Sequence, residues 1–355
     1  MKKILLGFFC LLVACCAYAT EVIEEEVYAY RDTLRIYGKM FRPECPGKLP
    51  AVVCSHSSSL THEAMKGYAE KLAEAGYAAY CFDFCGGSED SQSSGSTDSM
   101  TVFTEVEDLR AVVAMVKQID YVDSARVVLL GSSQGGLVSA ILAEQLQDAV
   151  ASMVLFYPAF NIPELVSMFS GMGNGSWGDG SWGDGSWGNG SWGSGSWGDG
   201  SWGGGSMGGM MSMSEKFIDT IKDYDVWSNI GTYSRPVCIV HGTSDFIVPI
   251  SNSEKAVQLY PHAELHPIQG ANHGFNEANL GGMGSIMGGQ TDYDGEVMPI
   301  VINFLKDNVT LDIRQLSDDM KSRSSSIYNL RGQVISAPRH GEIYIYEGKK
   351  MIGKR

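Results

Sequence analysis

The chain has 355 residues, a formal net charge of −15 and a pI near 4.9, and 44% of its residues are hydrophobic. This acidity excludes nucleic acid and anionic membrane surfaces as partners that are recognised by charge. No internal stretch approaches the roughly 18 consecutive apolar residues that a transmembrane span requires, so none is predicted.

The N-terminus has the pattern of an export signal. Two lysines precede an apolar run over residues 4–14, and an A-x-A cleavage site ends at Ala19. We therefore predict a signal peptide over residues 1–19 and an exported protein in the periplasm, at the cell surface or outside the cell. One alternative stays open, because L-V-A-C resembles a bacterial lipobox that would make Cys15 a lipid anchor.

Apolar patterns between residues 20 and 311 alternate between the periods of strands and helices. Strands are predicted at residues 21–40 (an antiparallel pair), 51–54, 77–84, 127–130, 150–157, 237–240 and 264–267. Helices are predicted at residues 63–75, 101–119, 214–224, 253–260 and 295–309, and from residue 134 onward. This alternation predicts an α/β fold with a mostly parallel sheet flanked by helices, in which the strands' carboxyl ends share one edge.

Two segments depart from this globular pattern. Residues 171–211 contain a repeated Gly-Ser-Trp-Gly-Asp unit, which predicts a flexible low-complexity insertion. An alternative is a flap whose tryptophans stack on sugar rings or aromatic acyl groups. The last residues, 312–355, are predicted to form a small β-rich appendage.

The central motif is G-x-S-x-G over residues 131–135, between a predicted strand and a predicted helix. A sharp strand-to-helix turn of this kind exposes the middle serine, Ser133, as a nucleophile. Gly131 and Gly135 are needed because neighbouring backbone approaches closely and a side chain would clash.

Nucleophilic catalysis also requires a base and a carboxylate that orients this base. Asp245 follows the strand predicted at residues 237–240, and His273 follows the strand predicted at residues 264–267. The order serine, aspartate, histidine is that of α/β-hydrolases, and it differs from the orders in chymotrypsin and subtilisin. We therefore predict that Ser133, Asp245 and His273 form a catalytic triad.

With these motifs in this order, residues 51–305 resemble the α/β-hydrolase superfamily, and within it the bacterial feruloyl/cinnamoyl esterase branch. The supporting segments are F-D-F-C-G-G-S-E (82–89), G-S-S-Q-G-G (131–136), H-G-T-S-D-F-I-V-P (241–249) and G-A-N-H-G-F (270–275). The resemblance implies that Ser133 is the nucleophile, with the other triad members as its base and orienting acid. It also implies an oxyanion hole made by the backbone amides of Ser58 and Gln134. The mechanism requires no cofactor.

The chain departs from the branch at three places. Ser57 stands where a glycine is expected, and Ser132 stands where the branch commonly has histidine. The lid position carries the tryptophan repeat, so the residues that select the acyl group cannot be transferred.

The C-terminal stretch from residue 327 to 350 resembles short sorting domains of secreted Bacteroidetes proteins, which implies the secretion machinery as a partner. A plain β-hairpin extension is the alternative.

The histidines and cysteines form no ligand-spaced cluster, so no metal site is predicted. His62, His262 and His266 are interpreted as surface or strand histidines. His56 and His241 lie next to the predicted site, and we interpret them as residues that shape their loops.

We interpret the chain as an exported serine hydrolase that cleaves carboxylic esters through an acyl-enzyme. Its expected substrate is a small ester or an acylated polysaccharide, with acetyl or feruloyl groups on plant polysaccharide as the leading example. Two alternatives stay open: a serine peptidase of the same fold, and a non-catalytic surface glycan-binding protein.

Overall fold

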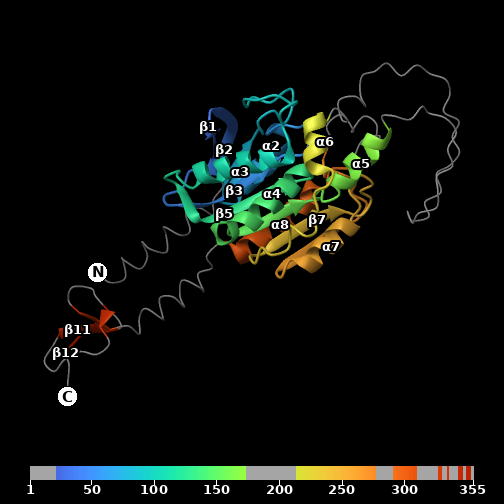
Figure 1. Cartoon of the computed structure of the whole chain (residues 1–355). Helices are drawn as coiled ribbons and strands as arrows, with labels where there is room; N and C mark the ends of the chain where they lie inside the picture. Colours follow the sequence, from blue (N-terminus) through green and yellow to red (C-terminus); the bar gives the residue numbers. More distant parts are fainter. Residues whose placement is uncertain are drawn as a thin grey trace. The chain divides into compact units, whose positions relative to one another are not determined.

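The structure, a computed structural model, describes residues 21–172, 213–276 and 291–309, and four short strands between residues 327 and 352 (Figure 1). The predicted signal peptide, the alternative anchor Cys15 and nearly all of the tryptophan repeat lie outside these residues. The chain divides into two compact units, Met1–Ile302 and Asn303–Arg355. No helix in the described ranges combines the length and apolarity needed to span a membrane.

The first unit is built on an eight-stranded sheet with the order β1-β2-β4-β3-β5-β6-β7-β8. The strands are β1 (Val22–Arg31), β2 (Leu34–Pro43), β3 (Leu49–Ser55), β4 (Ala78–Phe82), β5 (Val122–Ser132), β6 (Ser152–Phe156), β7 (Val237–Gly242) and β8 (Ala263–Ile268). The β1–β2 and β2–β4 pairs are antiparallel, and all other pairs are parallel. The predicted antiparallel start and mostly parallel sheet are therefore confirmed.

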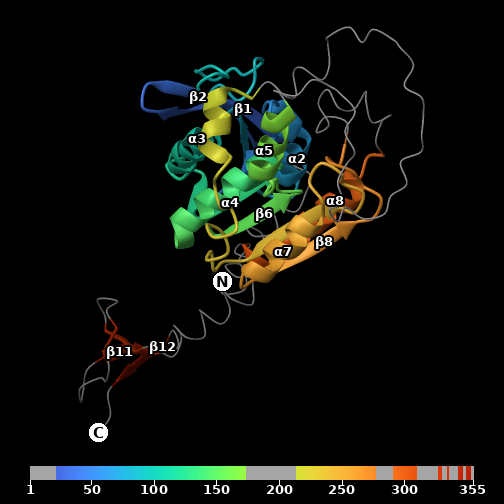
Figure 2. The same cartoon turned by 45° about the vertical axis from the view of Figure 1, so that its right-hand side comes forward.

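Helices lie on both faces of this sheet (Figures 1 and 2). They are α2 (Glu63–Glu74), α3 (Val102–Val116), α4 (Gln134–Leu146), α5 (Ile162–Met172), α6 (Glu215–Ile221), α7 (Ser251–Leu259) and α8 (Asp294–Asn308). The start of α3 is fixed by a capping box. The Thr101 hydroxyl accepts from the Thr104 amide at 3.1 Å, and the Thr104 hydroxyl accepts from the Thr101 amide at 2.8 Å.

The core strands are buried on both faces because successive side chains point to opposite sides of the sheet. On one face, Val53 and Leu129 pack in one cluster with Val112 of α3, and all three are fully buried. On the other face, Tyr68 of α2 packs edge-on against Phe156 of β6, with ring centroids 5.2 Å apart. Each such side chain contributes about 1.5–3 kcal/mol through burial, so the continuous apolar runs in the sequence hold the two layers of helices onto the sheet.

Two elements differ from the sequence prediction. Strand β5 begins at Val122, five residues before the predicted start at residue 127. Its first half holds one buried apolar residue, Val122, which pairs with β3, and then a polar stretch in which Arg126 forms an ion pair with Asp123 at 2.8 Å. Helix α5 was not predicted. Pro163 lies in its first turn, where a missing amide N–H is tolerated.

The second unit contains a four-stranded antiparallel sheet with the order β10-β9-β11-β12. Its strands are β9 (Ile327–Asn329), β10 (Val334–Ile335), β11 (Ile343–Tyr346) and β12 (Lys349–Ile352). The sorting role of this region stays a prediction.

Candidate active site

The predicted site residues follow the carboxyl ends of neighbouring strands in the sheet. Ser58 follows β3, Ser133 follows β5, Asp245 follows β7 and His273 follows β8, and these strands are adjacent except for the intervening β6. Tyr157, which directly follows β6, is a further residue at this edge that was not predicted as a site residue. Because parallel strands end at one edge of the sheet, residues more than 200 positions apart converge there.

Ser133 occupies a strained turn between β5 and α4. Its backbone has φ 51° and ψ −117°, a conformation that costs a side-chain-bearing residue about 1–3 kcal/mol. The surrounding backbone holds the turn, because the Ser133 amide donates to the Phe156 carbonyl at 2.9 Å and the Ser133 carbonyl accepts from the Ala159 amide at 2.9 Å. The turn therefore stays in the geometry that presents the hydroxyl.

The two motif glycines fit the close approach that the motif predicts. A Cβ atom at Gly131 would lie 2.2 Å from the carbonyl oxygen of Gly135. A Cβ atom at Gly135 would lie 2.5 Å from the carbonyl oxygens of both Ser55 and His56. Gly135 thus allows the start of α4 to pack directly on the end of β3, where the loop toward Ser58 begins.

The three side chains predicted as a triad form one continuous chain of contacts. The hydroxyl oxygen of Ser133 lies 3.0 Å from Nε2 of His273, and Nδ1 of His273 lies 2.8 Å from Oδ2 of Asp245. A carboxylate can only accept hydrogen bonds, so Nδ1 carries the proton and donates to Asp245. Nε2 is then the acceptor for the Ser133 hydroxyl, which is the arrangement a general base requires.

The Asp245 carboxylate is buried and receives donors on both oxygens. Oδ1 accepts from the amides of Ile247 and Val248, both at 2.9 Å, while Oδ2 is contacted by His273 and, at 3.2 Å, by Nε2 of His241. Burial alone would raise the pKa of Asp245. The charge of His273 and the hydrogen bonds from both histidines outweigh burial, so the pKa of Asp245 lies well below its ordinary value.

His241 holds the Asp245 loop in place. Its Nε2 lies 2.8 Å from the Val248 carbonyl oxygen, and its Nδ1 lies 2.6 Å from the Ser253 hydroxyl oxygen. Because a carbonyl oxygen only accepts, Nε2 carries the proton and is shared between Val248 and Asp245, while Nδ1 accepts from Ser253. These contacts agree with the interpretation of His241 as a loop-shaping residue. His241 also contacts the Asp245 carboxylate directly, which the sequence did not indicate.

Tyr157 is a site residue that sequence reasoning missed. Its ring packs edge-on against His273 with centroids 4.7 Å apart, and its backbone has φ 37°. The hydroxyl is buried beside Ser57 and Ser132, and burial raises the pKa of this hydroxyl. Those two serines are the chain's departures from the esterase branch, and their hydroxyl oxygens lie 3.0 Å apart. The departures therefore belong to one buried hydroxyl cluster behind the nucleophile.

The predicted oxyanion donors lie on the loop after β3 and at the start of α4. Gln134 is the first residue of α4, and first-turn amides have no acceptor within their own helix. The amide of Ser58 donates no hydrogen bond within the described part of the chain. The Gln134 side chain is buried, and its Nε2 donates to Oε2 of Glu105 at 2.7 Å. Glu105, on α3, was also missed in the sequence because it looks like an ordinary helical carboxylate.

Glu105 is expected to make stability depend on pH. Burial raises its pKa from 4.5 to about 8, although the hydrogen bond from Gln134 acts in the opposite direction. Between these pH values the folded protein keeps a proton that the unfolded chain has lost. The free energy of unfolding therefore falls by about 1.4 kcal/mol per pH unit as the pH rises, and this contribution is lost above about pH 8.

Urea unfolding at pH 5 and pH 8 checks this expectation. Glu105→Gln removes the ionisation and should flatten the decline in stability between the two pH values. Glu107→Gln, at an exposed position of the same helix, should leave the decline unchanged. Equal pH dependence in the wild type and Glu105→Gln would contradict the assignment.

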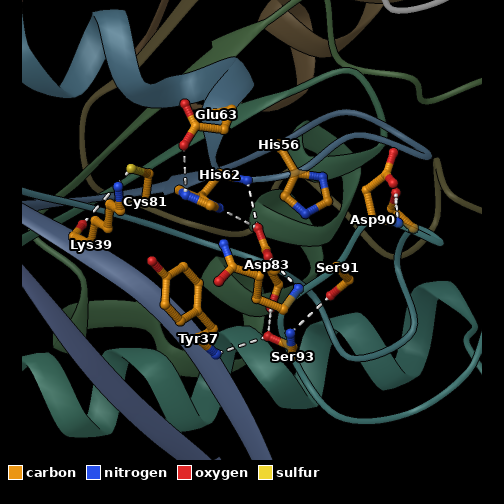
Figure 3. A network of polar contacts seen from close by, with 12 residues as sticks. Tyr37, Lys39, His56, His62, Glu63, Cys81, Asp83, Asp90, Ser91 and Ser93 are labelled. Atoms are coloured by element: carbon orange, nitrogen blue, oxygen red, sulfur yellow. Dashed lines mark hydrogen bonds and ion pairs between the residues drawn. The ribbon is translucent and has the colours of Figure 1, made fainter.

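A second polar network fixes the loop after β4 (Figure 3). His62 lies between Glu63 and Asp83, and its Nδ1 is 2.7 Å from Oδ1 of Asp83. The Gln92 amide donates to the other Asp83 oxygen at 2.8 Å, and the Ser93 hydroxyl donates to the Asp83 carbonyl at 2.6 Å. Burial would raise the pKa of Asp83, but the hydrogen bonds from His62 and Gln92 lower it overall.

This network corrects the interpretation of His62. It is 1% exposed and bonded to a buried carboxylate, so it is neither a surface nor a strand histidine. The sequence hid this because His62 and Asp83 are 21 residues apart. His262 is exposed and His266 lies in β8, as predicted.

Two hollows lie along this loop. One has a volume of about 260 Å³ and is lined mainly by serine and threonine; its lining residues are Gly86, Ser88, Glu89, Ser91, Ser93, Gly95, Ser96 and Thr97. The other, of about 30 Å³, includes Ser58 on one side and apolar Met100, Met213 and Phe217 on the other. Thr97 lines both, so the hydroxyl-rich hollow adjoins the hollow that reaches the predicted oxyanion donor.

Comparisons with known proteins agree with this architecture. The family model described as serine aminopeptidase, S33 matches residues 48–174. Est1E from Butyrivibrio proteoclasticus with bound ferulic acid is 21% identical, with a TM-score of 0.58 over 80% of this chain and 99% of Est1E. The esterase Pf2001 from Pyrococcus furiosus is 18% identical, with a TM-score of 0.51 over 82% of this chain and 94% of its own. A search of curated proteins finds no match. Likeness at these identities shows a shared fold.

Proposed function

We propose that this chain, which has the α/β-hydrolase fold, is a serine hydrolase that cleaves carboxylic esters. The observation that carries the proposal is the unbroken contact from Ser133 through His273 to Asp245. The strained turn at Ser133 and the two close-packed glycines support the same assignment.

In the proposed reaction, the Ser133 oxygen forms a bond to the ester carbonyl carbon while Nε2 of His273 takes the hydroxyl proton. Asp245 stabilises the resulting imidazolium. The amides of Ser58 and Gln134 stabilise the negative oxygen of the tetrahedral intermediate. The intermediate collapses, the alcohol leaves with the proton from His273, and an acyl-serine remains. A water molecule, deprotonated by the same imidazole, then releases the acid and restores the serine.

For the substrate, we propose an acyl group carried on a sugar hydroxyl, such as acetate or ferulate on plant polysaccharide. Ferulic acid is the molecule bound in the Est1E structure. The hollow of about 260 Å³ lined by serine and threonine hydroxyls suits a hydroxyl-rich alcohol group better than an apolar one. Peptide cleavage is the second candidate, because the matching family model is described as a serine aminopeptidase.

Export is part of the proposal. A charged and apolar leader followed by an A-x-A site supports cleavage after Ala19, in preference to lipid attachment at Cys15. We propose that residues 312–355 serve sorting by a secretion machinery, on the strength of their sequence resemblance alone.

A fluorophosphonate probe and three substrates test the function. The wild type should be labelled, should hydrolyse p-nitrophenyl acetate and should release acetate or ferulate from decorated xylan. It should act poorly on aminoacyl p-nitroanilides. Ser133→Ala should lose labelling and hydrolysis, whereas Ser132→Ala, at the neighbouring serine, should still be labelled. Preference for the anilides would support the peptidase, and absence of labelling would refute the serine hydrolase.

A further inference from the structure

Three potential metal ligands meet on strands β7 and β8, away from the residues of the triad. They are Cys238 of β7 and Glu264 and His266 of β8, and one ligand atom from each lies within 4.8 Å of the other two. The register brings them together, because Cys238 pairs directly with Glu264, and Val240, two residues on, pairs with His266. Residues two apart on a strand share one face of the sheet. All three side chains therefore point to the same side.

The spacing is close to what a metal ion requires. Nε2 of His266 lies 3.0 Å from Oε1 of Glu264. The ligands of a tetrahedral zinc ion, at about 2.0–2.3 Å from the metal, lie roughly 3.3–3.8 Å from one another. All three ligand atoms already lie within 4.8 Å of one another, and the exposed Glu264 and half-buried His266 side chains have room to rotate toward this range.

The thiol of Cys238 is the unusual member of the group. It is a free cysteine with 0% exposure, and it has no hydrogen-bond partner among the residues that the structure describes. The ionisable side chains beside it are those of Glu264, which is exposed to solvent, and His266, which is half-buried. Two of the three ligands are therefore open to solvent, while the third is buried beside them.

We propose that Cys238, Glu264 and His266 bind one zinc ion. Thiolate, imidazole and carboxylate are the ligand types that zinc prefers, and three protein ligands leave the fourth position to water. Binding breaks the S–H bond, forms the Zn–S bond and releases one proton to solvent. No ligand spacing in the sequence predicts this group, because Cys238 is 26 residues from Glu264.

The position of the ion suggests what it does. Among the strands that the structure describes, β8 is at the end of the sheet and pairs only with β7. The chain leaving β7 carries Asp245, and the chain leaving β8 carries His273. An ion bridging the two strands ties the terminal strand to its neighbour and so stabilises the pair from which both loops extend.

Titration of the full-length protein with Co²⁺ tests the site, because Co²⁺ takes tetrahedral zinc sites and reports a thiolate ligand by a near-ultraviolet charge-transfer band. We expect the band to saturate at one Co²⁺ per chain and to be displaced by Zn²⁺. Cys238→Ser should abolish the band. His266→Gln, at a half-buried position, and Glu264→Gln, at an exposed position, should both weaken Co²⁺ binding by about tenfold or more.

His262→Gln is the matched control, because His262 is an exposed histidine just outside β8. It should leave both the band and the affinity unchanged. Zn²⁺ should also raise the melting temperature of the wild type and of His262→Gln but not of His266→Gln. A thiolate band that survives Cys238→Ser, equal affinity in His262→Gln and His266→Gln, or no binding at all would overturn the proposal.

Discussion

Replacing Asp245 with asparagine is expected to lower kcat for ester hydrolysis by about 10⁴-fold while leaving the side-chain volume almost unchanged. The carboxylate accepts four contacts, from the amides of Ile247 and Val248 and from the rings of His241 and His273. An asparagine side chain has only one acceptor oxygen. Its amino group must therefore face a donor somewhere in this set.

The backbone amides of Ile247 and Val248 determine which way the asparagine side chain faces. If the asparagine oxygen faces Ile247 and Val248, its amino group faces Nδ1 of His273. This arrangement favours the tautomer with the proton on Nε2, which cannot accept the proton of Ser133. The loss should therefore appear in kcat and not in KM, because the Asp245 side chain is fully buried and presents no surface to a bound substrate.

Steady-state kinetics on p-nitrophenyl acetate measure this loss. Asp219→Asn, on the exposed face of α6, makes the same chemical change away from the site and should retain wild-type kcat. If Asp245→Asn kept more than about a tenth of wild-type kcat, His273 would not depend on Asp245 for its tautomer.

Gly135→Ala is expected to destabilise the fold by about 3 kcal/mol and to reduce kcat by about 10²-fold. The new methyl group would lie 2.5 Å from two backbone carbonyl oxygens, those of Ser55 and His56. Neither oxygen belongs to a flexible side chain, so the end of β3 must move away from α4. The movement displaces the loop toward Ser58 relative to Gln134, and the two proposed oxyanion donors separate.

Gly67→Ala is the same substitution at a position without close contacts, and it is expected to increase stability. Gly67 is an exposed position inside α2, and a Cβ atom there meets nothing within 4 Å. Alanine favours a helix over glycine by about 1 kcal/mol, so this variant should be more stable and fully active. Urea unfolding and kinetics on both variants make the comparison. Equal stability of the two would show that the contact at Gly135 relaxes without cost.

The parts of the site that sequence predicts well are those that follow apolar strands. Ser133 and Asp245 could be located because each comes just after a run of buried residues, and His273 because it follows the next strand along the chain, and a parallel sheet brings such positions to one edge. Helix α5 and the early start of β5 were not predicted, because local pairing and a first-turn proline determine them more than hydrophobic periodicity does.

The residues that sequence missed act through contacts between distant segments. Glu105 looks like one more carboxylate on an amphipathic helix, and only its contact with Gln134 shows that it is buried at the site. Tyr157 looks like the end of an apolar strand, although its ring packs on His273. A single sequence contains no spacing rule for such pairs, because the fold alone brings them together.

The left-handed backbone at Ser133 lowers the stability of the fold but keeps the hydroxyl that the proposed reaction requires. Glycine adopts this conformation freely, so a chain under pressure only to resist denaturation would carry glycine there. Serine persists at the price of a less robust fold, since the hydroxyl is what the reaction consumes and regenerates. Efforts to make this protein more heat-resistant should therefore leave the turn alone and look to positions such as Gly67, where rigidity can be added without touching the chemistry.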